Sequence, residues 1–176
     1  MIMHETEADR RAEWEIVNEL LARWGARAKK LHLKYKLDFM VYKSNKAIAW
    51  VEAKDRPTWE GYETYLLGFH KWGGAHQYLS FSRLPTVIAV RLKGQLMTYN
   101  VSPYDLGEFD IREGGRMDRD ETADIEPVIH IPIEKFSLFD EHNELWESPV
   151  LPLTIDRQNN LPLTIDRQNL GELDES

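Results

Sequence analysis

Hydrophobic residues recur with a helical period over residues 5–24 and then alternate with polar residues in several shorter stretches. The first stretch carries one apolar stripe, made of Trp14, Ile16, Val17, Leu20, Leu21 and Trp24. Because Gly25 follows and glycine readily ends a helix, the pattern predicts an amphipathic helix. Glu13 falls within the stripe on a helical wheel, where a carboxylate needs a charged partner or a metal ion unless fraying of the first turn exposes it.

Three strands are predicted next, over residues 28–34, 36–42 and 47–54. The last two form a hairpin, because the polar stretch 43–46 between them has the composition of a turn. Side chains on a strand alternate between its faces, so Glu52 and Lys54 point the same way. The antiparallel return brings this pair beside Asp38, at the start of the preceding strand. Two carboxylates and a lysine at one edge of a hairpin indicate a site where a divalent cation and a phosphodiester meet.

The second half of the chain predicts further helix and strand. Thr58 caps a helix over residues 59–72, and Gly73-Gly74 breaks or bends it before a second helical piece that ends near Ser82. Strands are expected over 86–91, 96–101 and 127–133, with mostly loop over 102–126. The first of these strands is nearly all apolar and so buried on both faces, whereas an internal proline places the last at a sheet edge. The order predicts an α/β fold, a mixed sheet with helices on its faces.

The chain of 176 residues is expected to form one main domain, over residues 1–136, followed by an acidic tail over 137–176. The tail contains a duplicated nine-residue segment, 151–159 and 161–169, which has too few copies for a solenoid. The absence of cysteine excludes disulfides and thiolate zinc sites. We find neither a secretion signal nor an apolar run long enough to span a bilayer, so we expect a cytoplasmic protein without membrane contacts.

The net charge of −8 disfavours nucleic acid as a partner, but the distribution of charge changes that conclusion. Between Arg23 and Lys46 there are eight basic residues and one acid, Asp38, which is the proposed metal ligand. Between Asp105 and Glu147, by contrast, there are fourteen acids and four basic residues. The basic segment favours a phosphate-bearing partner, although lysines on a strand also serve simply as a solvated face.

Asp38, followed by Glu52-Ala53-Lys54 at the end of the next strand, with a helix before and a helix–strand unit after, resembles the PD-(D/E)XK nuclease superfamily. Leu37 stands where the superfamily's name has proline, a position that touches no ligand. The stretches 50–54, 65–71, 84–90 and 124–132 are similar to small phage and prophage nucleases of this superfamily. The resemblance implies a restriction-endonuclease-like core of αβββαβ type, a divalent metal ion, DNA as the partner and, if the chain is phage-encoded, action in the bacterial host.

The resemblance also implies roles for individual residues. Asp38, Glu52 and the backbone carbonyl of Ala53 would bind Mg²⁺ or Mn²⁺ through oxygen. Lys54 would orient or deprotonate the attacking water and offset developing negative charge. Glu13 would make a supporting contact or help to hold a second ion.

Further basic and aromatic residues are candidates for contact with nucleic acid. Lys71, on the helix after the motif, is the candidate phosphate contact, and Lys36 and Lys43 of the basic segment are further candidates. Four aromatic residues could stack on bases, but at helical spacing they are expected in the core: Trp59, Tyr62, Tyr65 and Trp72. The six histidines lack zinc-ligand spacing, and no Gly-rich phosphate loop indicates an ATPase.

Three interpretations remain open. A metal-dependent deoxyribonuclease accounts for all the signature residues. A non-catalytic nucleic-acid-binding phage accessory protein that keeps the fold accounts better for the net acidity, and an α/β protein with accidental carboxylates is the third. Substrate structure and oligomeric state are not determined by these residues, although resolvases and restriction enzymes make a homodimer the expectation by analogy.

Overall fold

The computed structural model describes residues 6–32, 34–115 and 125–139. Within them, the helices are α1 (Glu7–Trp24) and α2 (Phe69–Ser82), and short 3₁₀ turns are η1 (Pro103–Asp105) and η3 (Ile133–Lys135). The strands are β1 (Arg27–Lys30), β2 (Phe39–Lys43), β3 (Lys46–Arg56), β4 (Thr64–Gly68), β5 (Thr86–Leu92), β6 (Gln95–Asn100), β7 (Ile111–Gly115), β8 (Ile125–Pro132) and β9 (Ser137–Leu138).

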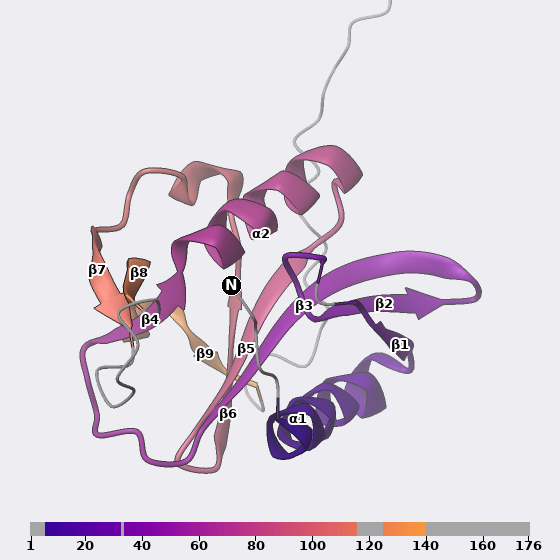
Figure 1. Cartoon of the computed structure of the whole chain (residues 1–176). Coiled ribbons are helices and arrows are strands. Elements are labelled where there is room, and N and C mark those ends of the chain that lie inside the picture. The colour runs from indigo at the N-terminus through magenta and orange to yellow at the C-terminus, as the bar shows by residue number, and fades with distance from the viewer. Residues whose placement is uncertain (1–5, 33, 116–124, 140–176) are drawn as a thin grey trace, which may run out of the picture.

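A six-stranded mixed sheet and a three-stranded antiparallel sheet form the framework (Figure 1). The large sheet has the order β1-β2-β3-β5-β6-β9, in which β3 and β5 are parallel and all other neighbours antiparallel. The small sheet has the order β4-β8-β7. The run α1, β1, β2, β3, α2, β5 confirms the predicted restriction-endonuclease-like α/β fold of αβββαβ type, with β4 added before α2.

The two helices cover opposite faces of the large sheet, and each face has its own core (Figure 1). Ile16 and Leu20 of α1 pack in one core with Val51 of β3. Trp72 of α2 packs in the other core with Val90 of β5. Because successive residues of β5 alternate between these two cores, the strand is buried on both faces, as its all-apolar run predicts.

The predicted first helix is confirmed as α1. The Thr6 side chain accepts a hydrogen bond from the Asp9 backbone N–H at 3.1 Å and so caps the helix, and Gly25 ends it in the left-handed conformation at φ 58°. Glu13 has only 5% of its surface exposed. The carboxylate is therefore buried on the apolar face, and the alternative of a frayed first turn is wrong.

The predicted helix over residues 59–72 is wrong in its first part. The stretch 64–68 forms β4, in which Tyr65 and Leu67 are buried and Leu66 between them is exposed. This period of two is typical of a half-buried strand. The buried aromatic residue therefore marks one face of a strand, and Thr58 caps no helix because it lies in a turn after β3.

The predicted break at Gly73-Gly74 is also wrong, because α2 begins at Phe69 and continues through both glycines. Gly74 packs against the side chain of Lys36, where a Cβ atom would collide. The glycine therefore permits a close approach between the helix and the segment before β2, and it does not end the helix.

Two predictions for the last strands need correction. β7 lies within residues 102–126, which were expected to be mostly loop. β8 is the middle strand of the small sheet and not an edge strand. Its two prolines, Pro127 and Pro132, fall near the ends of the strand, so the residues between them supply the ladder on both sides.

The predicted acidic tail lies almost entirely outside the described residues, which end at Phe139. The duplicated segment and the domain boundary therefore stay predictions. Within the described part of the chain, neither α1 nor α2 has the length and apolar character needed to cross a membrane.

Candidate active site

The second half of β3 extends beyond the start of β2 and leaves a free strand edge. β2 begins at Phe39, opposite Val51, and the remainder of β3 pairs with β5 on its other side. Asp38 lies at this point: its N–H donates to the Val51 carbonyl at 3.2 Å, and its Oδ2 accepts from the Ala53 N–H at 3.1 Å. Because the N–H and C=O of one strand residue point to the same side, the Ala53 carbonyl faces this edge too.

Lys71, in the first turn of α2, reaches the same edge from the face that α2 covers. Its Nζ donates to Asp38 Oδ1 at 3.0 Å and to Glu52 Oε2 at 2.7 Å. Glu52 is buried, with 6% of its surface exposed. The lysine predicted to contact phosphate therefore bridges the two carboxylates predicted to bind metal.

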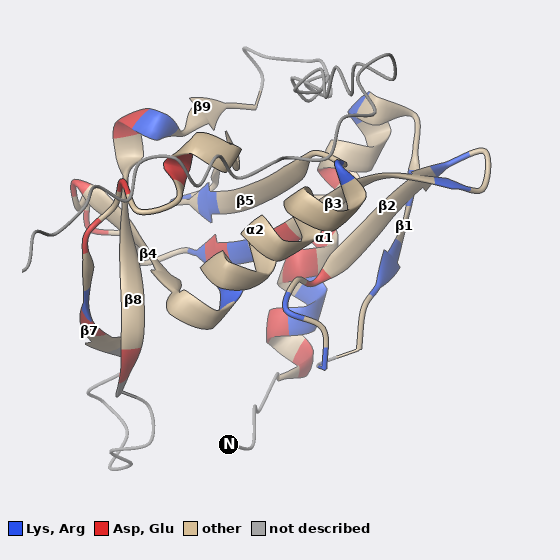
Figure 2. Cartoon of the chain, turned by 90° about the horizontal axis from the view of Figure 1, so that it is seen from above, with Lys and Arg blue, Asp and Glu red and all other residues tan. Residues whose placement is uncertain are grey.

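Glu13 comes to the site from α1, on the opposite face of the sheet. Its Oε2 accepts a short hydrogen bond from Lys30 Nζ, and its Oε1 lies 3.7 Å from Lys54 Nζ. Lys30 Nζ also lies 3.8 Å from Asp38 Oδ1, which joins this pair to the strand edge. We call the whole group the charged cluster: Glu13, Lys30, Asp38, Glu52, Lys54 and Lys71. Figure 2 shows acidic and basic segments in α1 and at the end of β3, and a basic segment at the start of α2.

The pKa values of the carboxylates in the charged cluster shift in different directions. Burial and the neighbouring Asp38 raise the pKa of Glu52 well above its usual range. Burial also acts to raise the pKa of Asp38, but the charges of Lys71 and Lys30 outweigh it and hold that pKa below its ordinary value. Burial and Asp38 raise the pKa of Glu13. The three carboxylates thus lie close together at a buried place, where lysine charges offset their repulsion.

The donor set at the strand edge fits a hard divalent cation. Within the described ranges, no group of three or more histidine, aspartate or glutamate side chains is placed to hold a metal ion. The carboxylates of Asp38 and Glu52 already share one positive charge from Lys71, and the Ala53 carbonyl adds a third oxygen. Oxygen donors of this kind are preferred by Mg²⁺ and Mn²⁺. Glu13, expected to make a supporting contact or to help hold a second ion, lies beside the ammonium groups of Lys30 and Lys54.

The two other lysines predicted to bind nucleic acid lie at different distances from this site. Lys36 is exposed, two residues before Asp38, and its side chain packs against α2 at Gly74. Lys43 stands at the far end of β2, where its Nζ donates to the Trp24 carbonyl at 3.3 Å. Of the two, only Lys36 is near the charged cluster along the chain.

Lys30 is the member of the charged cluster that the sequence analysis did not single out. It pairs with Phe39 in the antiparallel ladder of β1 and β2, next to Asp38. The pairing of β1 with β2 could have identified it. A prediction of this register would have placed Lys30 beside Asp38.

The four aromatic residues expected in the core do not all lie there. Tyr65 and Trp72 are buried, as predicted, with 2% and 3% of their surfaces exposed. Trp59 is partly buried at the margin of the core. Tyr62 is 57% exposed, so its assignment to the core is wrong, because the helix that would have turned it inward is absent.

Comparisons with known proteins identify a family and a fold for the chain. A family model described as "Phage putative PDDEXK endonuclease" matches residues 2–139. Among solved structures, a Holliday junction resolvase from the archaeal hyperthermophile Archaeoglobus fulgidus is 12% identical with a TM-score of 0.50, and the match covers 77% of this chain and 94% of that chain. A nuclease from a fusellovirus is 13% identical with a TM-score of 0.47, covering 80% and 92%. No curated protein sequence is significantly similar to the chain. At this identity the resolvase supports the fold.

Proposed function

The chain belongs to the phage PDDEXK endonuclease family, and we propose that it is a metal-dependent nuclease that hydrolyses phosphodiester bonds in DNA. The observation that carries this proposal is the free edge of β3. There, the carboxylates of Asp38 and Glu52 are joined through one ammonium group, and the Asp38 carboxylate accepts the N–H of Ala53, whose carbonyl faces the same edge. An accidental group of carboxylates has no reason to gather hard oxygen donors and lysines at an unpaired strand edge.

In this proposal, Asp38, Glu52 and the Ala53 carbonyl hold a Mg²⁺ or Mn²⁺ ion. Such an ion, when bound, lowers the pKa of a water molecule and neutralises charge on the phosphate. Asp38 is suited to this role because its lowered pKa keeps it ionised. Burial raises the pKa of Glu52, and a bound cation would act in the opposite direction by favouring its ionised form.

We assign Lys54 to the attacking water and to the charge that develops on the phosphate. Its side chain is 30% exposed, so it can reach a substrate, and Glu13 Oε1 lies 3.7 Å from its Nζ. Glu13 is then a positioning residue, because it holds the Lys54 ammonium without contacting the reacting atoms. This role corresponds to the supporting contact expected for Glu13, whereas its role in holding a second ion stays a prediction.

We propose that Lys71 contacts the phosphate of the substrate once its ammonium group has left the two carboxylates. A divalent ion on Asp38 and Glu52 would compete with its ammonium for the same oxygens. Lysine has a flexible four-carbon stem, so its Nζ can turn outward to a phosphate oxygen while α2 stays in place. Encoded by a phage, such an enzyme would act on DNA in the bacterial host.

The first test is a cleavage assay with linear, circular, single-stranded and four-way-junction DNA, each with Mn²⁺ and with EDTA. The Glu52→Gln variant, which keeps the shape of the side chain, serves as the control. Cleavage that requires both the metal and Glu52 is expected, and the DNA that is cut identifies the substrate. If no DNA is cut but DNA is still bound, the non-catalytic accessory protein becomes the better description.

A further inference from the structure

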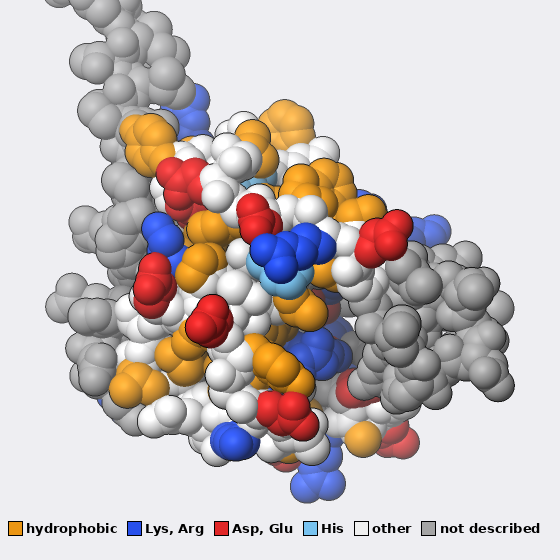
Figure 3. Space-filling model, turned by 90° about the vertical axis from the view of Figure 1, so that its left-hand side faces the viewer, with side chains coloured by type: hydrophobic (Ala, Val, Ile, Leu, Met, Phe, Trp, Pro, Cys, Tyr) orange, Lys and Arg blue, Asp and Glu red, His pale blue; other side chains and the backbone are white. Residues whose placement is uncertain are grey.

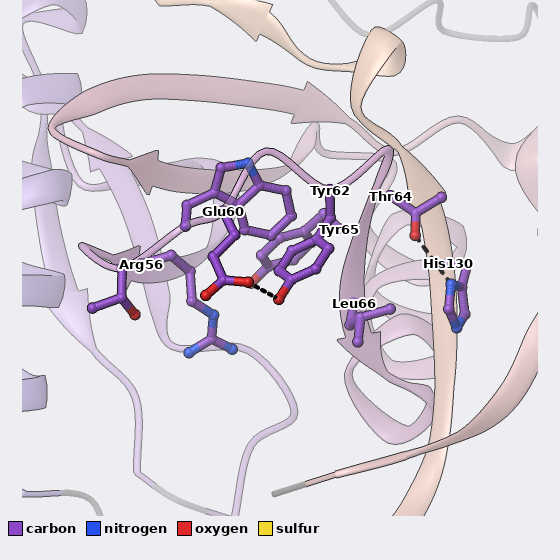
Figure 4. Close-up of a pocket in the computed structure, with 9 residues that line it drawn as sticks. Arg56, Glu60, Tyr62, Thr64, Tyr65, Leu66 and His130 are labelled. Carbon is purple, nitrogen blue, oxygen red and sulfur yellow. Dashed lines mark hydrogen bonds between the residues drawn. The ribbon is translucent and has the colours of Figure 1, made fainter.

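A pocket of about 450 Å³ opens directly after the end of β3. Its lining comes from Arg56 at the end of β3, from the loop and strand that follow, and from β8: Arg56, Thr58, Trp59, Glu60, Tyr62, Thr64, Tyr65, Leu66 and His130. Figure 4 shows Arg56 and Glu60 on one side of the tyrosine rings and the pair Thr64 and His130 on the other. A volume of this size is in the range of pockets that hold small organic ligands.

The pocket adjoins the charged cluster through β3. Glu52, Lys54 and Arg56 are alternate residues of this strand and so point to one face. Arg56 therefore follows Glu52 at about 13 Å along the strand, which is the rise of four extended residues. Tyr65 lines the pocket and is buried. Burial raises its pKa to about 12, and the charges of Arg56, Glu52 and Asp38 also act on that pKa. A strand of DNA on the carboxylates would pass the pocket within a few nucleotides.

The lining combines aromatic faces with hydrogen-bonding groups of both kinds. The rings of Trp59 and Tyr62 meet edge to face, with centroids 5.3 Å apart and an angle of 85°. The Tyr62 hydroxyl donates to Glu60 Oε2 at 2.6 Å, which holds the exposed ring beside the opening. On the other side, Thr64 Oγ1 lies 3.0 Å from His130 Nδ1.

We propose that this pocket binds one unpaired nucleobase of the DNA strand whose phosphodiester lies at Asp38 and Glu52. The inference rests on the proposed nuclease function and adds the class of substrate, a DNA with an unpaired nucleotide near the cleaved bond. Tyr62 stacks on the base, and Arg56 and Glu60 offer a donor and an acceptor to its edge. Pockets for single bases in other enzymes combine the same elements, aromatic stacking and hydrogen bonds to the base edge.

The charges of the lining favour a base over a phosphate group. The Glu60 carboxylate would repel a phosphate, whereas it accepts hydrogen bonds from the amino and imino groups of bases. Figure 3 shows the side of the molecule that carries the small sheet, where hydrophobic side chains are interspersed with acidic and basic ones. The described residues on this side form no continuous positive track for phosphates, so recognition through an aromatic face is the better match.

The test compares the affinity for two duplexes that differ by one base. The first carries a single bulged nucleotide, and the second carries an abasic sugar at the same place. Binding is measured by fluorescence anisotropy with Ca²⁺, a hard cation that carboxylates also bind, and gel analysis checks that the DNA stays intact. The wild type is expected to bind the bulged base roughly 5- to 150-fold more tightly than the abasic site, the range that base–aromatic stacking supplies.

Three variants separate the pocket from other causes. Tyr62→Ala should remove the preference, and Tyr62→Phe should keep most of it, because the ring remains. Tyr104→Ala is the matched control, since Tyr104 is 64% exposed in η1, outside the pocket lining, and its loss should leave the preference unchanged. Circular dichroism confirms that each variant is folded.

The outcomes distinguish this inference from the nuclease proposal. Equal affinity of the wild type for the two duplexes, no binding of either, or a preference that survives in Tyr62→Ala overturns the pocket assignment, while cleavage in the Mn²⁺ assay leaves the nuclease standing. A preference that depends on Tyr62, without cleavage of any DNA, keeps the pocket and overturns the nuclease.

Discussion

The buried carboxylate of Asp105 and the carboxylates of the charged cluster are stabilised in different ways. Asp105 in η1, 8% exposed, accepts hydrogen bonds from the Tyr99 hydroxyl and, at 2.8 Å, from the Ser102 backbone N–H. Both donors are uncharged. In the charged cluster, by contrast, Asp38 and Glu52 share the ammonium of Lys71.

The difference separates a structural carboxylate from chemically usable ones. The donors of Asp105 lie on a fixed backbone and a packed ring, so an incoming ion could replace them only by disrupting the fold. The lysines of the charged cluster have long, flexible stems and can give up their contacts to a metal ion or a phosphate. Burial alone is therefore weak evidence for an active site, and burial with exchangeable partners is what the proposed site adds.

The largest effect should come from Lys54→Ala. We expect cleavage to fall by about 10³-fold, within the range for groups that assist proton transfer, because the attacking water loses its partner. DNA affinity should change by less than about threefold, since one lysine among several contacts contributes little to binding. Single-turnover cleavage and anisotropy measure the two effects separately. Equal losses of cleavage and binding would make Lys54 a phosphate anchor instead.

Lys46→Ala is the matched control for this prediction. Lys46 is exposed at the opposite end of the same strand, where it pairs with Lys43 across the hairpin. Its removal changes the net charge by the same amount as removal of Lys54. Cleavage by this variant should stay close to that of the wild type, so that a general effect of charge is excluded.

The second effect concerns the structural carboxylate. Asp105→Ala should lower the free energy of unfolding by roughly 2–4 kcal/mol, because the buried Tyr99 hydroxyl and the Ser102 N–H each lose an acceptor. Urea denaturation measures the change, with Asp110→Ala as the exposed control, since the pair of Asp110 with Arg112 lies at the surface. The rate of cleavage per folded molecule should be unchanged. A stable but inactive Asp105 variant would remove the distinction between the two groups.

The parts of the fold with strong local patterns could be predicted from the sequence. The stripe of α1, the polar turn at Ser44-Asn45 and the apolar run of β5 depend on near neighbours, and all three are confirmed. The helix predicted over residues 59–72 is wrong in its first part because that segment depends on a distant part of the chain. The strand β4 is stabilised by its partner β8, sixty or more residues away along the chain, and no local pattern reveals that partner.

The same distinction holds for the site. Asp38, Glu52 and Lys54 could be brought together from hairpin geometry alone. The contact of Lys71 with both carboxylates depends on where α2 lies across the sheet, and the contact of Lys30 depends on the register of β1. The pocket at Tyr62 was not predicted, because the aromatic residues that line it were expected in the core on one face of a helix.

The third effect tests whether the partners in the charged cluster can be exchanged. Mg²⁺ or Mn²⁺ at ten times its dissociation constant should stabilise the wild type by about 1.4 kcal/mol, and Asp38→Asn should abolish the shift. Thermal unfolding at increasing ion concentration measures it. Asp110→Asn, which removes an exposed carboxylate, should keep the full shift. A shift that persists in the Asp38 variant would place the ion elsewhere.

The smallest effect is a loss of folding stability in acid that we expect from His76 of α2. Its ring packs edge to face on Trp72 at 4.4 Å, and its Nε2 is buried without a hydrogen-bond partner among the described residues. Burial lowers the pKa of His76, against an opposing effect of Asp105. The unfolded chain therefore binds a proton more readily than the folded one, so this contribution to stability is present above about pH 6.5 and is lost as the pH falls through the folded pKa.

His76→Gln, which cannot titrate, should therefore lose less stability than the wild type between pH 7.5 and pH 5 when urea midpoints are compared. The exposed His32, changed to glutamine, should follow the wild type. If His76→Gln and the wild type lose the same stability, His76 does not contribute to the acid dependence. Glu52 and Glu13 act in the opposite direction, because a raised pKa favours the folded state at low pH and the contribution is lost as the pH rises through the folded value. Because the two proteins share these carboxylates, the difference between them isolates the contribution of His76.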